Sequence, residues 1–583
     1  MAETQRKLIN DPDKLIEELI AGMVSAHPRH LTVEGGTGRA IVALNGPRDG
    51  KVGIVVGGGS GHEPAFAGYV GKGLADAAPL GNIFASPSPA QIADAGLAAD
   101  GGAGVLFLYG NYTGDVMNFA MAEEALAKRG VTARSFVVTD DIASAPVERA
   151  EERRGIAGDF FVFKVAGAAA DLGLSLEEVE RAAQRANAAT RTMGVALSPC
   201  SMPQTGRTNF EIPIGEMEIG MGIHGEPGIE RIPAEGANAV ADRLLGPILE
   251  ELAPRDGDRV AVLVNGLGAT TLLELYLLHR RVAETLADKG VAIHHSWVGE
   301  YCTSLEMGGA SVTLMKLDAE LTTWLDHPCD TPALRVGASA PAQQGRRKGL
   351  SRASETETAP VERNDLRIDG TVTPGIFRAM LDASARAIFA EADRLSALDG
   401  EIGDGDHGVT MEIGWKAVRE ALSQVPADAP PTQVCGLVAQ AFLDAVGASA
   451  GPLYASAFTS AGAAVSDRLN LDAGAMAAWL EGMASGIRRR GGAAPGDKTM
   501  VDAWVPAAAA AKARLGDGGS VAELLDRAAA AAEIGAESTR DMQSRLGRSA
   551  RLGARSVGHV DAGAASAAVM IRAWARAARE AGA

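Results

Sequence analysis

The sequence predicts an α/β N-terminal half joined to an all-α C-terminal half. Up to about residue 336, short β-branched runs alternate with glycine turns and helical stretches, a pattern typical of α/β layers. Residues 337–363 then lack hydrophobic periodicity, and alanine-rich helical stretches follow from residue 364 with no convincing strand between them. With 583 residues the chain is also too long for a single hydrophobic core.

Five apolar runs in the first half are predicted strands. Each is a continuous run of mostly aliphatic residues, which is typical of strands that are buried on both faces. Because helical stretches alternate with them, we expect largely parallel sheets. The runs are KVGIVV (51–56), GVLFLY (104–109), SFVVTD (135–140), RVAVLV (259–264) and SVTLMKL (311–317).

The second half begins after a predicted flexible linker, residues 337–363, which is composed of small, proline and charged residues. Thr373 is expected to cap a helix whose first residue is Pro374, because proline is well tolerated in the first turn. Apolar side chains near helical spacing follow this cap. Further helices are expected around 437–446, 471–488, 501–514, 521–534 and 563–581.

Charge and composition exclude several classes of function. The net charge is -18, which argues against nonspecific nucleic-acid binding, because that binding needs a basic surface. The four cysteines are scattered without a C-x-x-C spacing, as expected for a reducing cytoplasm. The charged N-terminus and the absence of an apolar run of about 18 residues predict neither an export signal nor a membrane span.

An acidic loop carries the strongest chemical signal in the second half. In LDGEIGDGDHGVTM (398–411), Asp399, Asp404 and Asp406 follow a D-x4-D-x-D spacing at the end of a predicted helix, among glycines that let the chain fold back. Three carboxylates without a nearby thiolate suit a hard cation such as Mg²⁺. A solvated acidic turn and a calcium site are the alternatives, although the spacing does not match an EF-hand loop.

Three later stretches supply parts that a bound nucleotide needs. VGASAGPLY (446–454) is a small-residue loop whose backbone N–H groups can approach phosphates, and PGDKTMVDAW (495–504) and GRSARLGARSVGHVDAG (547–563) add glycine turns and arginines. The sequence contains no Walker A motif. Together with a carboxylate metal site, these stretches suggest Mg-ATP.

A glycine-rich stretch in the first half surrounds one histidine. In GMGIHGEPG (220–228), His224 stands among four glycines and a proline. Glycine permits a close approach of backbone and ligand and accepts positive φ, so the stretch predicts a loop that presents His224 to a ligand. A turn that merely contains a histidine is the alternative.

These motifs resemble those of the ATP-dependent dihydroxyacetone kinases, in which a ketose-binding domain is fused through a linker to a helical nucleotide-binding domain. The resemblance extends over nearly the whole chain. It rests on GGGSGHEPAFAGYVGKG (57–73), NYTGDVMNF (111–119), GMGIHGEPG, TPALRVG (331–337), LDGEIGDGDHG, GPLY, GDKTMVDA and GRSARLGARSVGHVDAG.

The resemblance implies roles for residues of the first half. The histidine that matches His224 attacks the ketose carbonyl and holds the substrate as a covalent hemiaminal, and the glycines would let the substrate reach the ring. Asp115 matches a candidate general base for the acceptor hydroxyl, and His62 matches a substrate-binding histidine that assists. Gly59, Ser60 and Gly61 would line the same site.

For the second half, the resemblance implies an antiparallel eight-helix barrel in which Asp399, Asp404 and Asp406 bind a pair of Mg²⁺ ions that bridge the ATP phosphates. It also implies a homodimer and a domain division into 1–336, a linker at 337–363, and 364–583, with two α/β subdomains at about 1–190 and 191–336. The residues that match nucleotide contacts are His407, Gly408, Val409, Thr410, Ala448, Ser449, Gly491, Met500, Arg548, Asp561 and Gly563.

The chain departs from the family pattern at three places. The family's phosphate loop, G-G-[AS]-S-G-P, is shifted here to GASAGP (447–452), and Ala562 replaces a usual proline. Gly110 stands where the family commonly has lysine before NYTGD. A missing ammonium group there predicts a roomier pocket that could admit a four-carbon ketose such as erythrulose.

Three functional hypotheses remain open at this point. The chain is expected to be an ATP-dependent ketose kinase. A phosphotransferase-system subunit arrangement is disfavoured by the covalent linker, and a non-catalytic ketose sensor is disfavoured because the histidine and the carboxylates are all retained. Cyclisation of FAD, which some family members perform, stays open as a side activity.

Overall fold

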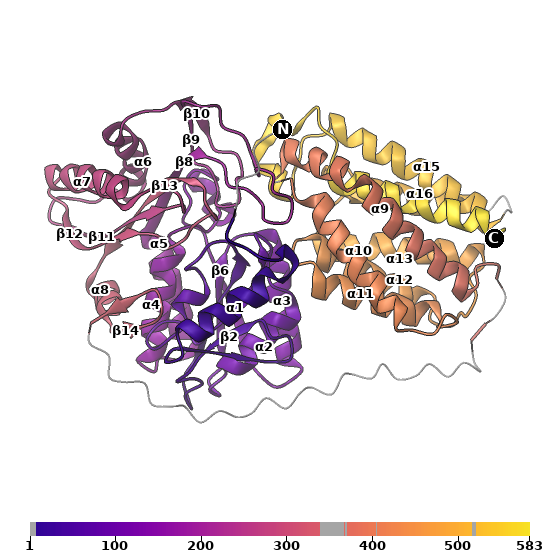
Figure 1. Cartoon of the computed structure of the whole chain (residues 1–583), viewed down its shortest axis with the longest axis horizontal. Helices are drawn as coiled ribbons and strands as arrows, with labels where there is room; N and C mark the ends of the chain where they lie inside the picture. Colours follow the sequence, from indigo (N-terminus) through magenta and orange to yellow (C-terminus); the bar gives the residue numbers. More distant parts are fainter. Residues whose placement is uncertain (1–6, 338–365, 368–369, 404, 516–519) are drawn as a thin grey trace. The chain divides into compact units, whose positions relative to one another are not determined.

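The computed structural model describes residues 7–337, 366–367, 370–403, 405–515 and 520–583. The chain divides into two compact units, Met1–Ala353 and Ser354–Ala583, coloured from indigo to pink and from orange to yellow in Figure 1. Except for Gly337, the predicted linker lies outside the described residues. In the described residues, no helix is both long enough and apolar enough to cross a membrane.

The first sheet of the N-terminal unit has parallel strands at its centre, and the predicted strands at 51–56, 104–109 and 135–140 are confirmed within it. Strands β3, β5, β6 and β7 run parallel, while β1 and β2 form an antiparallel edge. The strand order is β1 (Leu31–Glu34), β2 (Ala40–Ala43), β5 (Ala77–Ile83), β3 (Gly53–Val56), β6 (Val105–Gly110) and β7 (Ala133–Val138), with β4 (Gly58–Ser60) paired to β5.

The second sheet is mostly antiparallel, so the expectation of largely parallel sheets is wrong here. Its order is β10 (Glu230–Pro233), β9 (Glu216–Ile219), β8 (Thr190–Ser198), β13 (Gly308–Leu317), β11 (Arg259–Gly266) and β12 (Ala292–Gly299). Within this sheet β11 and β12 pair parallel, but β13 pairs antiparallel with both β8 and β11. A continuous apolar run shows burial on both faces, which β13 has, and burial does not specify strand direction.

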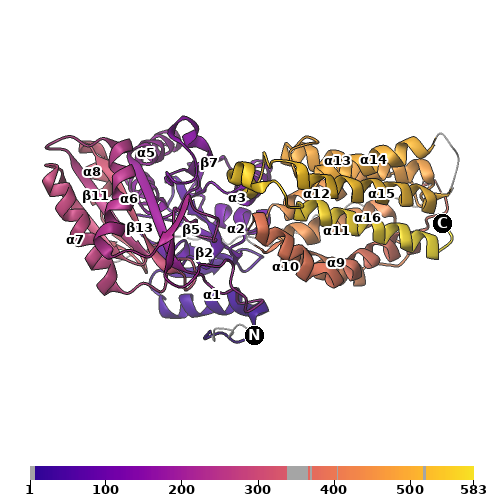
Figure 2. The ribbon, with the colours of Figure 1, turned by 90° about the horizontal axis from the view of Figure 1, so that it is seen from above.

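Helices separate and cover the two sheets (Figures 1 and 2). One face of the first sheet is covered by α2 (Pro89–Ala99) and α3 (Thr113–Ala127), and the other by α4 (Asp159–Asp171) and α5 (Leu176–Ala189). Helix α5 also contacts β8 and β13 of the second sheet, whose other face is covered by α6 (Ala237–Leu252) and α7 (Leu272–Asp288). The remaining helices of this unit are α1 (Leu15–Ala26) and α8 (Ala319–Asp326).

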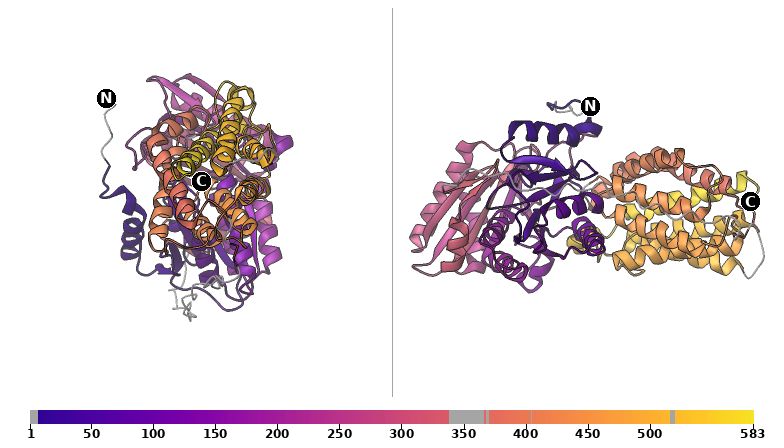
Figure 3. Two further views of the ribbon diagram at one scale, coloured as in Figure 1. Left: turned by 90° about the vertical axis from the view of Figure 1, so that its right-hand side faces the viewer. Right: turned by 90° about the horizontal axis from the view of Figure 1, so that it is seen from below.

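The described part of the C-terminal unit contains a ring of eight α-helices, which confirms the all-α prediction (Figure 3). Each helix packs on the next, and the last packs on the first, which closes the ring. The helices are α9 (Pro374–Ile402), α10 (His407–Ser423), α11 (Pro431–Ala445), α12 (Ala450–Ala464), α13 (Ala473–Gly491), α14 (Val501–Arg514), α15 (Val521–Ser538) and α16 (Ala562–Glu580).

Helix α9 begins as predicted, whereas two helices were not predicted. Thr373 caps α9 by accepting the backbone N–H of Ile376, and Pro374 occupies the first turn. The sequence analysis assigned no helix to the residues of α10, and it interpreted 446–454, which includes Gly451 and Pro452 at the start of α12, as a small-residue loop. Both residues lie in the first turn of α12, where a missing N–H leaves no intrahelical hydrogen bond unmade.

Tryptophans fill the centre of the helical ring. Trp415, Trp479, Trp504 and Trp574 are fully buried, and the rings of Trp479 and Trp574 meet edge to face with centroids 4.7 Å apart. Trp479 also donates its indole N–H to Cys435 Sγ at 3.3 Å. These large aromatic side chains fill the volume that the small side chains of the many alanines on the surrounding helices leave open.

Replacing Trp479 with alanine is expected to destabilise the helical unit by about 3–5 kcal/mol, because it leaves a large cavity among aromatic rings. The measurement is the free energy of unfolding from urea titration, followed by far-ultraviolet circular dichroism. Ile534→Ala on α15, where the side chain is 72% exposed, is the control and should change the free energy by less than about 0.5 kcal/mol. Equal effects of the two substitutions would contradict this description of the core.

Candidate functional site

His224 lies in the loop between β9 and β10, and this loop is shaped by its glycines. Gly220 and Gly225 have φ values of 78° and 87°, which favour glycine. A Cβ atom at Gly222 would overlap the Glu226 carboxylate and the Arg154 guanidinium. We expected the bare glycines to admit the ligand, but at Gly222 the free space is filled by these two charged side chains of the protein itself.

Two histidines meet at this loop. The Nε2 atoms of His62 and His224 are 3.1 Å apart, and His62 Nδ1 lies 2.8 Å from the backbone oxygen of Thr303. On its other side, His224 Nδ1 lies 3.0 Å from Glu226 Oε1. The structure therefore brings together two histidines that are 162 positions apart in the sequence, as the predicted site requires.

Burial controls the charge of these groups. Desolvation, and secondarily the neighbouring His224, lower the pKa of His62 to about 3, so His62 is neutral at physiological pH. Arg154 is 2% exposed and forms an ion pair with Asp141 at 2.7 Å. Its Nη1 also lies 4.0 Å from Glu226 Oε2. The charged groups behind His224 are thus compensated inside the protein.

Aromatic rings surround the histidine pair. Phe84 stacks on His62 with ring centroids 5.1 Å apart, and Tyr112 meets His224 edge to face at 4.6 Å. Tyr112 immediately precedes α3, and the predicted base Asp115 lies in the first turn of that helix, just after the carboxyl end of β6. Asp115 is buried and lies three residues after Tyr112, whose ring contacts His224.

The other predicted substrate residues, Gly59, Ser60 and Gly61, lie directly before His62. The Ser60 hydroxyl donates to the Gly81 oxygen at 2.8 Å, which occupies its donor. A Cβ at Gly59 would lie 2.6 Å from the backbone nitrogen of Ala85, so this position requires glycine for packing. Gly61 has a φ of 101°, which turns the chain toward His62.

Position 110 offers no spare volume. A Cβ at Gly110 would lie 2.9 Å from the Gly155 oxygen and 3.1 Å from Tyr112 Cε2. The expected extra room is therefore not found at Gly110 itself, where the Gly155 backbone and the Tyr112 ring already pack. Position 110, being glycine, still supplies no ammonium group beside Tyr112.

In the helical unit, most of the predicted nucleotide residues line one cavity of about 190 Å³. It is bordered by the N-terminal ends of α10, α12, α14 and α16, which lie together because every second helix of an up-and-down ring starts at the same end. Such helix ends attract anions. The predicted residues that line it are Asp399, Asp406, His407, Thr410, Ala448, Ser449, Met500, Asp561 and Gly563.

The remaining predicted residues of this half are placed differently. Gly408 packs so closely on α9 that a Cβ would overlap the Ala392 backbone oxygen, and Val409 does not line the cavity. Gly491 ends α13, and a Cβ there would lie 2.9 Å from Leu453 Cδ2, a residue that does line the cavity. Two predicted features fall outside what the structure describes: the residue Asp404 and the side chain of Arg548.

Two carboxylates of the predicted metal site lie close together. Asp399 Oδ2 accepts the backbone N–H of Asp406 at 3.1 Å, and burial together with the Asp399 charge raises the pKa of Asp406 to about 7. Burial also raises the pKa of Asp561 to about 7. Crowded carboxylate oxygens of this kind fit a hard divalent cation. Among the described residues, which omit Asp404, no group of three metal-ligating side chains is present.

Comparison with known proteins identifies the family. Residues 21–333 match the Dak1 domain, and residues 401–576 match the DAK2 domain. The chain belongs to the dihydroxyacetone kinase family. It is 40% identical to the D-erythrulose kinase of Mycolicibacterium smegmatis, with 97% of each chain covered. It is 38% identical to the L-erythrulose kinase of Pectobacterium atrosepticum, with 97% of this chain and 95% of the relative covered.

A solved structure of a dihydroxyacetone kinase is similar to this chain over nearly its whole length. The dihydroxyacetone kinase from C. freundii in complex with AMP-PNP and Mg²⁺ is similar over 98% of this chain and 99% of that chain, with a TM-score of 0.53 and 29% identity. The similarity therefore extends over both units of the chain.

The sequence analysis did not single out Lys498, a buried lysine that lines the cavity of about 190 Å³. Lys498 is fully buried, lines the cavity and donates to the backbone oxygens of Thr539 and His559. It thereby connects the segment before α14 to the turn after α15 and to the loop that leads into α16. Its motif, GDKTM (496–500), was interpreted as a glycine turn, and Lys498 stands between Asp497 and Thr499, so the local sequence does not indicate its burial.

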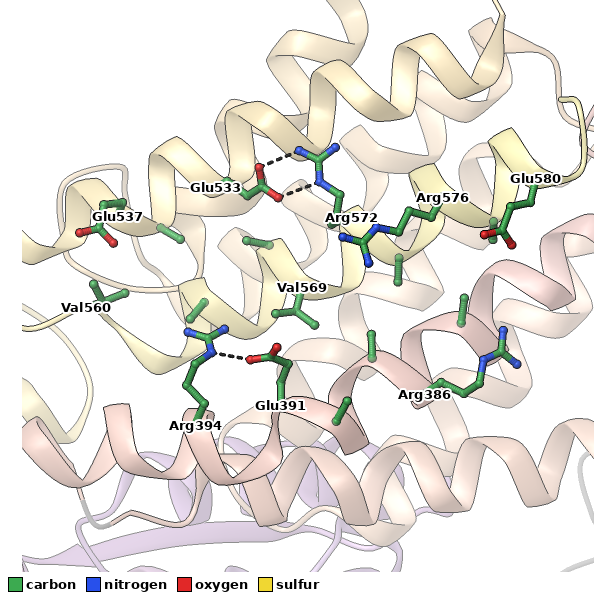
Figure 4. A pocket seen from close by; sticks show the side chains of 18 residues that line it. Arg386, Glu391, Arg394, Glu533, Glu537, Val560, Val569, Arg572, Arg576 and Glu580 are labelled. Atoms are coloured by element: carbon green, nitrogen blue, oxygen red, sulfur yellow. Dashed lines mark hydrogen bonds and ion pairs between the residues drawn. The ribbon is translucent and has the colours of Figure 1, made fainter.

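A larger cavity of about 580 Å³ lies between α9, α15 and α16, away from the predicted residues (Figure 4). Alanines form its walls, and charged pairs such as Arg572 with Glu533, 2.7 Å apart, lie around it. No residue predicted to bind nucleotide or metal lines this cavity in the described part of the chain. The predicted nucleotide residues therefore line the smaller of the two cavities and not the larger one.

His62 is expected to stay neutral, protonated at Nδ1, from pH 8 down to pH 5, because its pKa in the folded chain is about 3. In the unfolded chain, His62 binds its second ring proton near pH 6.5, whereas in the folded chain it does not. His62 should therefore lower the free energy of unfolding as the pH falls from about 6.5 toward 3. Nitrogen-15 NMR of labelled histidines checks the protonation state, with His62→Asn used for assignment. A midpoint near 6.5 for His62 would contradict the burial argument.

Proposed function

We propose that this chain is an ATP-dependent kinase that phosphorylates a terminal hydroxyl of a short-chain ketose, dihydroxyacetone or erythrulose, while the ketose is held as a hemiaminal on His224. The observation that carries the proposal is the placement of His224, whose Nδ1 is fixed by Glu226 and whose Nε2 lies beside His62. A coupled assay of ADP release with dihydroxyacetone, glyceraldehyde and both erythrulose enantiomers tests it.

Covalent capture suits a small substrate. A triose or tetrose offers little apolar surface, so ordinary contacts fix its position poorly. A bond between His224 and the carbonyl carbon orients the molecule and selects ketones over polyols. Orientation matters because phosphoryl transfer depends mostly on positioning and charge neutralisation.

Asp115 is proposed to take the proton from the attacking hydroxyl. It follows a central strand of a largely parallel sheet, where α/β proteins usually bind ligands. His62 is proposed to hydrogen-bond the oxygen that derives from the ketose carbonyl, since its neutral Nε2 points toward His224.

ATP is proposed to bind at the cavity bordered by four helix N-termini, with its phosphates near Ala448, Ser449 and His407. Asp399, Asp404 and Asp406 would hold Mg²⁺. When bound, Mg²⁺ neutralises phosphate charge and orients the transferred group. Similarity to the C. freundii kinase bound to AMP-PNP and Mg²⁺ supports this assignment.

Transfer requires the ketose and nucleotide sites to meet, either within one chain or between two chains of a homodimer. We propose the homodimer, which light scattering of the purified chain checks. In an equal mixture of His224→Ala and Asp406→Asn chains, a mixed dimer has one intact ketose site and one intact nucleotide site, on different chains. Recovery of activity in this mixture would show that sites of different subunits act together.

The alternatives are less well supported. In a phosphotransferase-system arrangement the two units are separate chains, whereas here both are parts of one chain. A non-catalytic sensor would be expected to lose the histidine or the carboxylates, and the sequence retains both. The coupled assay separates these possibilities, because ATP consumption without a partner protein requires a complete kinase.

Asp406→Asn is expected to lower kcat by about a hundredfold or more, since it removes an anionic ligand and the charge neutralisation that depends on it. Helix content should be unchanged, because Asp406 lies before α10 outside the hydrophobic core. Asp467→Asn, at an exposed carboxylate that does not line the cavity, is the matched control. Near-normal turnover of Asp406→Asn at saturating Mg²⁺ would rule out the metal assignment.

An erythrulose is expected to be used at least as efficiently as dihydroxyacetone. Gly110 provides no ammonium donor beside Tyr112, and one lost polar contact changes discrimination by about 1–3 kcal/mol. The similarity to D- and L-erythrulose kinases agrees with this direction but supports neither enantiomer over the other. The measurement is kcat/KM for all three ketoses. A tenfold preference for dihydroxyacetone, about 1.4 kcal/mol, would overturn the prediction.

A further inference from the structure

Three side chains and one backbone carbonyl form a continuous row of hydrogen bonds at His224. The Thr303 oxygen lies 2.8 Å from His62 Nδ1, the two Nε2 atoms lie 3.1 Å apart, and His224 Nδ1 lies 3.0 Å from Glu226 Oε1. Glu226 Oε2 accepts the backbone N–H of His224 at 3.0 Å. Both oxygens of one carboxylate therefore hold the same histidine.

The ends of this row determine where its protons lie. A carbonyl oxygen only accepts hydrogen bonds, so His62 Nδ1 carries a proton and the Nε2 of neutral His62 is an acceptor. The hydrogen bond between the two rings then requires a proton on His224 Nε2. If Glu226 is ionised, its bond to His224 requires another proton, on His224 Nδ1. In that arrangement His224 is an imidazolium paired with the Glu226 carboxylate.

Arg154 disfavours the other arrangement, in which a protonated Glu226 would donate to a neutral His224. Its guanidinium lies 4.0 Å from Glu226 Oε2, and a cation at this distance favours the ionised carboxylate. Arg154 is itself held by Asp141 at 2.7 Å and by the Gly220 oxygen at 2.9 Å. The carboxylate thus lies between two cationic groups in the protein interior.

We propose that Glu226 is a positioning residue for hemiaminal formation, a role that rests on the proposed function above. It fixes His224 through Nδ1, so that Nε2 is the reacting atom, and its charge balances the cationic ring of the adduct. The Nε2 proton first passes to His62 Nε2, which frees the lone pair of His224 Nε2. As Nε2 then bonds to the carbonyl carbon, the π electrons of the C=O bond move to oxygen, and this oxygen takes the proton from His62 Nε2.

This sequence conserves charge inside a buried site. The His224 ring is cationic before the reaction, as an imidazolium, and after it, as an N-alkylated imidazolium. The ketose enters and remains neutral, and Glu226 remains a carboxylate throughout. Because creating an uncompensated charge in a protein interior is costly, a pair that is already ionised makes the adduct more accessible.

Glu226→Gln tests the charge with little change of shape, because the amide oxygen can still accept the Nδ1 proton. We expect about a tenfold or larger rise in KM for the ketose, with a smaller change in kcat. Dihydroxyacetone labelled with carbon-13 at its carbonyl should show a bound tetrahedral carbon with the wild-type chain and at least about tenfold less of it with Glu226→Gln. Glu226→Asp, which restores the charge, should recover part of the adduct.

Glu218→Gln is the matched control, because Glu218 is a buried carboxylate of the neighbouring strand β9 that accepts hydrogen bonds from Gly228 and Arg231. It should leave KM and the adduct unchanged. An undiminished adduct in Glu226→Gln would overturn the role of Glu226. Absence of the tetrahedral carbon from the wild-type chain would instead contradict the covalent step of the proposed function.

A second measurement needs no substitution and therefore does not depend on the variant folding. In nitrogen-15 NMR of the wild-type chain without ketose, near neutral pH, His224 should carry protons on both ring nitrogens while His62 carries one, on Nδ1. A singly protonated His224 would overturn the proton assignment on which the role of Glu226 depends.

Discussion

The geometry of the proposed ketose site depends on one buried group of charges. Arg154 pairs with Asp141 and approaches Glu226, and Glu226 in turn holds both the ring and the backbone of His224. Buried ions of this kind are costly when any partner is missing, so the whole set must be present for any member to be stable. The bare backbone at Gly222 is what allows the set to assemble. The glycine-rich loop is therefore explained first by the charges it admits.

The helical unit solves a different electrostatic problem with its topology. An up-and-down ring brings the N-termini of α10, α12, α14 and α16 to one end without any dedicated anion-binding motif. The positive ends of these helices then face the crowded carboxylates Asp399 and Asp406 across one small cavity. A phosphate chain with a divalent cation complements both charges. This explains why a chain without a Walker A motif can still be suited to a nucleotide.

The sequence predicted more of the chemistry than of the geometry. The strand runs, the cap at Thr373 and the segments that carry His62 and His224 were recognisable, because they depend on local pattern. The antiparallel pairing of β13, the contact between the two histidines and the burial of Arg154 were not, because each depends on partners far along the chain. Glu226 could have been singled out, since it stands two residues after His224 in the same motif.

The central claim is that His224 binds the ketose through a covalent bond from Nε2. The most direct measurement is a crystal structure of the full chain with bound erythrulose or dihydroxyacetone. A hemiaminal at this site predicts continuous electron density from His224 Nε2 to a tetrahedral substrate carbon, with Glu226 still bonded to Nδ1. A fully occupied, planar ketose at non-bonded distance from His224 would contradict it.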